Sequence, residues 1–116
     1  MAHPPAEAIG LDGVERAGSY LERAVKDGGD RGARWHMMMG SFEGALAFAK
    51  GLGAVHGLSH ALGRIHELKL HHGTLNAVFL PAVIAFNASA DSVIKERRLE
   101  RMASAMGLAS AGDIGP

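Results

Sequence analysis

The stretch GLGAVHGLSHALGRIHELKLHHGTLNAVFLPAVIAFN, residues 51–87, decides the fold and carries five of the seven histidines. His56 and His60 are four residues apart, so a helix places both on one face, about 6 Å between their Cβ atoms. His72 stands directly before Gly73, where a second, apolar helix is expected to begin, and can face the first two. Spacing alone therefore predicts a site of three imidazoles with a fourth metal position open, as in catalytic zinc sites.

The same stretch carries a longer motif. Its residues are Gly51-Leu52-Gly53, Val55-His56, His60, Leu62-Gly63, His72-Gly73, Asn76-Ala77, Leu80-Pro81, Val83 and Phe86-Asn87. This pattern resembles the metal-binding region of the iron-containing (group III) alcohol dehydrogenases, although the loop before His72 is longer than in many members. Residues 4–25 and 33–52 are similar to two preceding helices of that family, so the resemblance covers nearly the whole chain.

The resemblance implies a fold, an activity and site residues. It implies an all-α, bundle-like fragment of about four to five helices from a dehydroquinate synthase-like/iron-containing alcohol dehydrogenase helical domain. In the family, Fe²⁺ or Zn²⁺ held by one aspartate and three histidines polarises the alcohol oxygen and helps hydride leave for the nicotinamide of NAD(P). His56 and His72 match two histidine ligands, and His60 matches the non-ligating histidine beside the nicotinamide and substrate. His66 and His71 have no counterpart.

Two parts of the family pattern are not found in these 116 residues. Family members place an α/β nucleotide-binding domain before this region, and a D-x-x-x-H helix just upstream supplies the other two metal ligands. We therefore expect this chain by itself to be inactive as an alcohol dehydrogenase with NAD or NADP. Two or three imidazoles without a carboxylate favour Zn²⁺, Ni²⁺ or Cu²⁺ over Fe²⁺.

Composition bounds the class of protein. A length of 116 residues predicts one domain, residues 1–116. A hydrophobic content of 47% with 5% aromatic residues predicts an interior of Ala, Leu, Met and Val. Twelve basic and twelve acidic residues leave no net charge to attract nucleic acid or an anionic membrane. The absence of cysteine excludes disulfides and thiolate metal sites. With no secretory signal and no apolar run of ~18 residues, we expect a cytoplasmic protein.

Apolar residues at helical spacing predict the secondary structure. Asp27-Gly28-Gly29-Asp30 ends one helix and begins the next, with Asp30 as the N-cap. Pro81 is expected to kink an apolar helix that lies at the centre of the molecule. The expected helices span residues 6–26, 31–49, 54–62, 73–87 and 91–106, and residues 109–116 form a frayed tail.

The expected helix at residues 31–49 holds a run of large side chains. Trp35 and Met37-Met38-Met39 suggest a ligand-binding stripe, but methionines on an apolar helical face usually fill irregular core space, so we predict that this helix is well buried. His36 is interpreted as an exposed or capped residue without a role. In the last helix Ile94, Leu99, Met102 and Met106 are expected to face inward.

Three functions remain open. The first is a metal-binding helical domain of an oxidoreductase acting on a small alcohol or aldehyde. The second is a non-enzymatic helical oligomer, and the third is a weak histidine-based metal-binding module. Cofactor-binding and turnover assays distinguish the first two. In each case we expect a homo-oligomer, most simply a dimer, because the helices at 54–62 and 73–87 are apolar and zero net charge does not oppose association.

Overall fold

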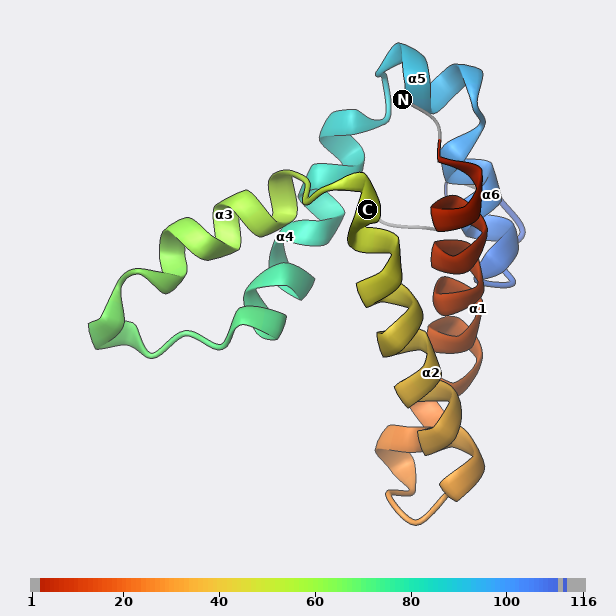
Figure 1. Ribbon diagram of the computed structural model, residues 1–116, viewed down its shortest axis with the longest axis vertical. Helices are drawn as coiled ribbons and strands as arrows, with labels where there is room; N and C mark the ends of the chain where they lie inside the picture. The colour runs from red at the N-terminus through yellow and green to blue at the C-terminus, as the bar shows by residue number, and fades with distance from the viewer. Residues whose placement is uncertain (1–2, 111, 113–116) are drawn as a thin grey trace.

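The computed structural model describes residues 3–110 and 112, and every regular element in that part of the chain is helical. This confirms the all-α prediction (Figure 1). The elements are α1 (Pro4–Lys26), α2 (Arg31–Ala47), η1 (Phe48–Lys50), α3 (Ala54–Gly63), η2 (His66–Leu68), α4 (His72–Asn87), α5 (Asp91–Lys95) and α6 (Arg98–Ala105), where η marks a short 3₁₀ helix. Most of the predicted tail, residues 109–116, lies outside the described residues. No helix of the described part is long and apolar enough to cross a bilayer.

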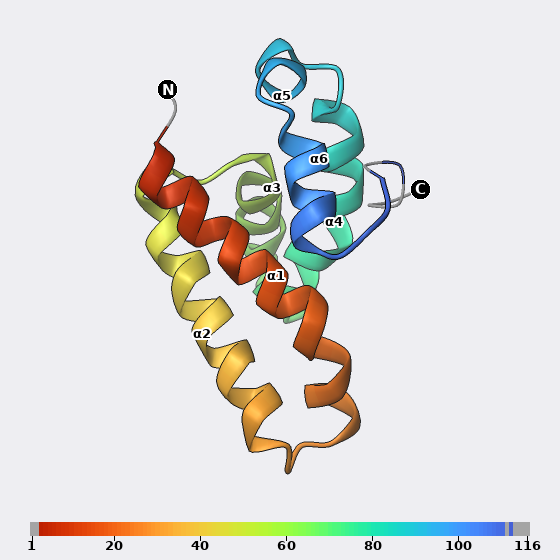
Figure 2. The same cartoon turned by 90° about the vertical axis from the view of Figure 1, so that its right-hand side faces the viewer.

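Helices α1 and α2 form an antiparallel hairpin (Figure 2). Side chains cap both helices, since His3 Nδ1 accepts from the Ala6 N–H at 3.2 Å and Asp30 Oδ1 accepts from the Ala33 N–H at 2.9 Å. The predicted N-cap at Asp30 is confirmed. These caps pair N–H groups that the first turn of each helix otherwise leaves without partners.

The backbones of α1 and α2 come closest to each other at a pair of glycines. A Cβ atom on Gly40 would lie 3.2 Å from the Gly13 carbonyl oxygen, and one on Gly13 would lie 3.2 Å from the Gly40 oxygen. Only glycine allows the two backbones to touch in this way. Beside the contact, Arg16 Nη2 lies 2.7 Å from Asp12 Oδ2 and Arg16 Nε lies 3.1 Å from Glu43 Oε2, so a shared guanidinium joins the helices.

His36 has a structural role in this hairpin, contrary to the prediction. Its ring stacks on Tyr20 of α1 with 3.7 Å between centroids, and its Nδ1 lies 3.0 Å from Arg16 Nη1. A histidine on α2 therefore reaches α1 through both its face and its edge. The sequence did not indicate this because Tyr20 and Arg16 are distant along the chain.

The prediction that α2 is well buried is wrong. Trp35 and Phe42 are more than half exposed, and Met38 is 70% exposed. Only Ala33 and Glu43 of this helix are buried. The reason is that, among the described helices, α2 packs extensively only on α1, which covers one of its sides.

Helices α3 and α4 pack against each other and form an arm, residues 54–87, that projects from the hairpin (Figure 1). Leu75 is buried, but Val78 and Leu80 are exposed and Phe86 is 83% exposed. The prediction that α4 is central is therefore wrong. Its apolar character is present on all sides, yet within the described residues α3 is the main element that packs against it.

The last predicted helix, residues 91–106, is two helices. Arg97 adopts a left-handed conformation with φ 49°, which ends α5 and redirects the chain. The break lets α6 lie along α1, where Ala103 is buried and a Cβ on Gly18 would lie 3.3 Å from Met106 Cα. Ile94 is exposed rather than inward, because α5 does not share this packing.

Glu7 links three elements at this junction. Its carboxylate lies 2.6 Å from Lys50 Nζ of η1 and 3.3 Å from Arg101 Nη1 of α6. The hydrogen bond from Lys50, aided by the one from Arg101, lowers the pKa of Glu7 from 4.5 to about 2. The contacts that stabilise the ionised form of Glu7 are therefore made by the folded arrangement of α1, η1 and α6.

Candidate metal centre

The arm brings together the three histidines that the sequence singled out. His56 and His60 lie one turn apart on α3, and His72 is the first residue of α4. Their ring centroids are 5.3 Å apart for His56 and His72, 5.0 Å for His60 and His72, and 6.1 Å for His56 and His60. His56 is half-buried, whereas His60 and His72 are exposed.

One polar group lies between two of these rings. Asn76 Nδ2 is 3.1 Å from His72 Nε2 and 3.5 Å from His56 Nε2, so the two Nε2 atoms converge on one position. The Asn76 Oδ1 atom is buried and has no hydrogen-bond partner within the described residues. Convergent imidazole nitrogens are what a shared metal ion needs, so His56 and His72 fit a metal as a pair.

His60 does not complete a triad. The described part of the chain contains no group of three or more His, Cys, Asp or Glu side chains arranged to hold a metal ion. The three-imidazole site predicted from spacing alone is therefore wrong. The convergence that the structure does show involves the other two rings, because Asn76 Nδ2 lies beside Nε2 of both His56 and His72.

The buried hydroxyl of Ser59 contacts both histidines of the pair, His56 and His72. Ser59 is 1% exposed, and its Oγ donates to the His56 carbonyl oxygen at 3.1 Å. The same oxygen lies 3.3 Å from His72 Nδ1. The ring of Phe48 meets the His56 ring edge-on at 5.4 Å. The sequence motif does not include Ser59, although a serine three residues after a helical histidine can reach that histidine's carbonyl.

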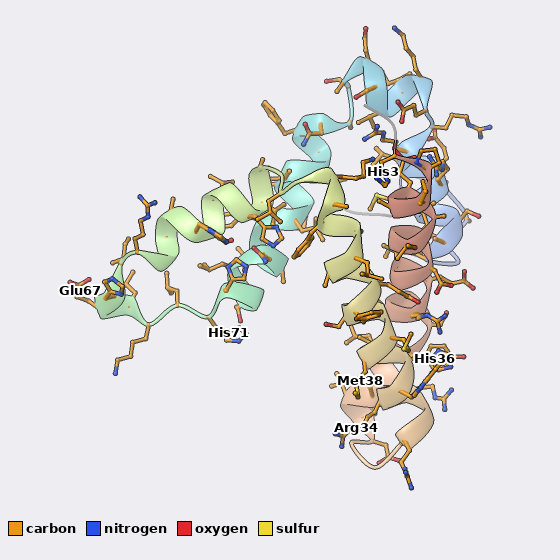
Figure 3. All side chains as sticks on the ribbon, viewed as in Figure 1. His3, Arg34, His36, Met38, Glu67 and His71 are labelled. Atoms are coloured by element: carbon orange, nitrogen blue, oxygen red, sulfur yellow. The ribbon has the colours of Figure 1, made fainter. Side chains whose placement is uncertain are left out.

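The other histidines of the arm have different positions. His71 is the N-cap of α4, since its Nδ1 accepts from the Thr74 N–H at 3.4 Å. His66 belongs to η2, next to Glu67, which marks the outer end of the arm (Figure 3). Capping gives His71 a structural explanation that the sequence motif lacked.

An open groove of about 480 Å³ begins beside His56 and runs between α3 and α4. It is lined by Gly53, Ala54, Val55, His56, Asn76, Ala77, Leu80, Val83 and Asn87. Most of this lining is apolar, while His56 and Asn76 place polar atoms at one part of it. Such a groove suits a small molecule with an apolar body and one oxygen function.

Comparison with known proteins gives consistent relatives. The family model described as "Fe-containing alcohol dehydrogenase family, C-terminal" matches residues 1–114. The 4-hydroxybutyrate dehydrogenase of Cupriavidus necator is 52% identical over 115 residues, which are 97% of this chain and 30% of that protein. The NAD-dependent methanol dehydrogenase of Bacillus methanolicus is 36% identical over 107 residues, 91% of this chain and 26% of that protein. Lactaldehyde reductase of Escherichia coli (strain K12) is 34% identical over 83 residues, which are 71% of this chain and 21% of that protein.

The chain therefore spans less than a third of the length of each of these relatives. No solved structure gives a significant match.

Proposed function

Because this chain belongs to the Fe-containing alcohol dehydrogenase family and matches its C-terminal part, we propose that its arm supplies two metal ligands, His56 and His72, to an oxidoreductase centre for alcohols or aldehydes. The observation that supports this proposal is the convergence of the two Nε2 atoms on Asn76 Nδ2, at 3.5 Å and 3.1 Å. A divalent ion bound there would act as a Lewis acid on the substrate oxygen.

The residues around the pair have distinct tasks in this proposal. The Nε2 lone pairs of His56 and His72 would hold the ion, and Asn76 would then give up its contacts with them, because one lone pair cannot serve two partners. His60 is exposed on the same face of α3, and by the family resemblance it faces the nicotinamide of NAD(P) and the substrate. The groove holds the apolar part of the alcohol or aldehyde.

Metal titration tests the ligand assignment. Two imidazoles without a carboxylate bind Zn²⁺ or Ni²⁺ better than Fe²⁺, so calorimetry with Zn²⁺ is the direct measurement. We expect His56→Ala and His72→Ala each to abolish the weak binding of the parent. His66→Ala, in the loop of the same arm, is the matched control and keeps it. Parent-like binding by both ligand variants would assign the metal to other histidines.

We propose that these 116 residues do not transfer hydride on their own. Hydride transfer requires substrate and nicotinamide in near-attack geometry, an effect of about 7–11 kcal/mol, and the groove beside His56 is open to solvent. Turnover is measured by reduction of short aldehydes with NADH and with NADPH in added Zn²⁺ or Fe²⁺. Metal-dependent reduction above the metal-free control would contradict this proposal.

The exposed apolar side chains favour a second property, self-association of this chain into a symmetric dimer. Those on α2, α3 and α4 are Trp35, Met38, Phe42, Leu46, Leu58, Val78, Leu80 and Phe86. A specific interface buries about 800 Å² per partner, which about four large side chains supply. Light scattering at micromolar concentration decides it, since a folded monomer of 12.1 kDa would overturn the proposal.

A further inference from the structure

We propose that Ser59 is a positioning residue of this centre, whose hydroxyl selects the tautomer of His72 that leaves Nε2 free to bind a metal. The inference rests on the proposed function, because it takes His72 as a ligand. It concerns Ser59, Asn76 and the proton on the His72 ring.

The hydrogen-bond inventory of Ser59 determines where that proton lies. A serine hydroxyl has one proton to donate and two lone pairs to accept with. The carbonyl oxygen of His56, at 3.1 Å from Ser59 Oγ, only accepts, so it takes the serine proton. The second contact, at 3.3 Å to His72 Nδ1, must then have the ring nitrogen as donor. A neutral imidazole with its proton on Nδ1 has its lone pair on Nε2.

The contacts of Nε2, on the opposite edge of the His72 ring, also indicate that the proton lies on Nδ1. Asn76 Nδ2 lies 3.1 Å from His72 Nε2 and carries two protons, one for each neighbouring Nε2 atom. Rotating the Asn76 amide by half a turn would place Oδ1 beside the two Nε2 atoms. It would also bury an NH₂ group with two unpaired protons. The observed orientation leaves a single unpaired oxygen, Asn76 Oδ1. Fewer unpaired polar atoms favour the arrangement in which Nε2 accepts.

Burial makes the serine hard to replace. Ser59 is 1% exposed, so water cannot take the place of the missing hydroxyl without rearranging α3 and α4. The hydroxyl also connects the backbone of one proposed ligand to the ring of the other. Outer partners that orient a ligating histidine typically change metal affinity by 10–100-fold when they are removed.

The test compares the parent with Ser59→Ala and with Ser41→Ala, which removes an exposed serine of α2. Long-range ¹H–¹⁵N NMR at about pH 8, where an ordinary imidazole is neutral, reports which ring nitrogen of His72 carries the proton. The His72 signals are assigned by their absence from His72→Ala. We expect an Nδ1 proton in the parent and in Ser41→Ala, and a shift of the population towards Nε2–H in Ser59→Ala.

Zinc calorimetry on the same samples gives the second readout. The Zn²⁺ affinity of Ser59→Ala is expected to fall about 10-fold. Ser59→Thr, which keeps the hydroxyl, should restore both the tautomer and the affinity. An unchanged His72 tautomer in Ser59→Ala overturns the proposal for Ser59 whether or not zinc binds. A parent that binds no Zn²⁺ instead overturns the metal role of His56 and His72, and the NMR comparison then still decides the role of Ser59.

Discussion

The glycine contact between α1 and α2 allows a quantitative test with an internal control. Gly40 and Gly44 are both interior residues of α2, but a Cβ on Gly40 would lie 3.2 Å from the Gly13 oxygen, whereas one on Gly44 would meet nothing within 4 Å. Replacing either with alanine gains the same helix propensity, about 1 kcal/mol. Only Gly40→Ala also forces the two helices apart.

The difference between the two variants isolates the packing term. Overpacking a closely packed contact costs about 1–3 kcal/mol, so we expect Gly44→Ala to stabilise the protein by about 1 kcal/mol and Gly40→Ala to fall about 1–3 kcal/mol below it. Urea unfolding followed by far-UV circular dichroism, at one protein concentration, measures both free energies of unfolding. Equal stabilisation by the two substitutions would mean that the backbones of α1 and α2 do not touch at Gly13 and Gly40.

Three further predictions concern charge, the metal pair and the apolar surface. Because folding lowers the pKa of Glu7 from 4.5 to about 2, its contribution to stability is complete above pH 4.5 and is lost as the pH falls to about 2. Urea unfolding should therefore show that the stability advantage of the parent over Glu7→Gln shrinks as the pH falls across that window. An advantage that stays constant would contradict the ion pairs. Asn76→Asp places a carboxylate where two Nε2 atoms converge, so calorimetry should show that Zn²⁺ binds about 10-fold more tightly than to the parent. Weaker binding would show that residue 76 does not face His56 and His72. Phe86 is 83% exposed, so Phe86→Lys should lower the apparent mass in light scattering if α4 lies in the interface, whereas Lys95→Ala on α5 should not.

Local signals in the sequence were sufficient for most of the helices. The first helix ends at Lys26 as predicted and Asp30 caps the second, because glycines and a capping carboxylate act within a few residues. The break at Arg97 was not predictable in this way. A left-handed arginine is unfavourable by itself, and the packing of α6 along α1 that accompanies it involves residues far apart in sequence.

Burial was predicted less well than helicity, for a related reason. The apolar residues of α2 and α4 show which surfaces prefer to leave water, but not which surface of the chain covers them, and Met38 and Phe86 are among those left exposed. At the site, the spacing of His56 and His60 predicted a shared helix face. The contacts of Ser59 and Asn76 with His72 depend on how α3 meets α4, which no periodicity describes.

The position of the histidine pair on one continuous arm has a consequence for the order of folding. His56 and His72 are sixteen residues apart, whereas Glu7 and Arg101 are 94 apart. Loop-closure entropy grows with the logarithm of this separation, so the longer closure costs about 1.6 kcal/mol more. Short closures occur early, and α-helical hairpins of low contact order form quickly. We therefore expect the two imidazoles to meet before α6 reaches α1.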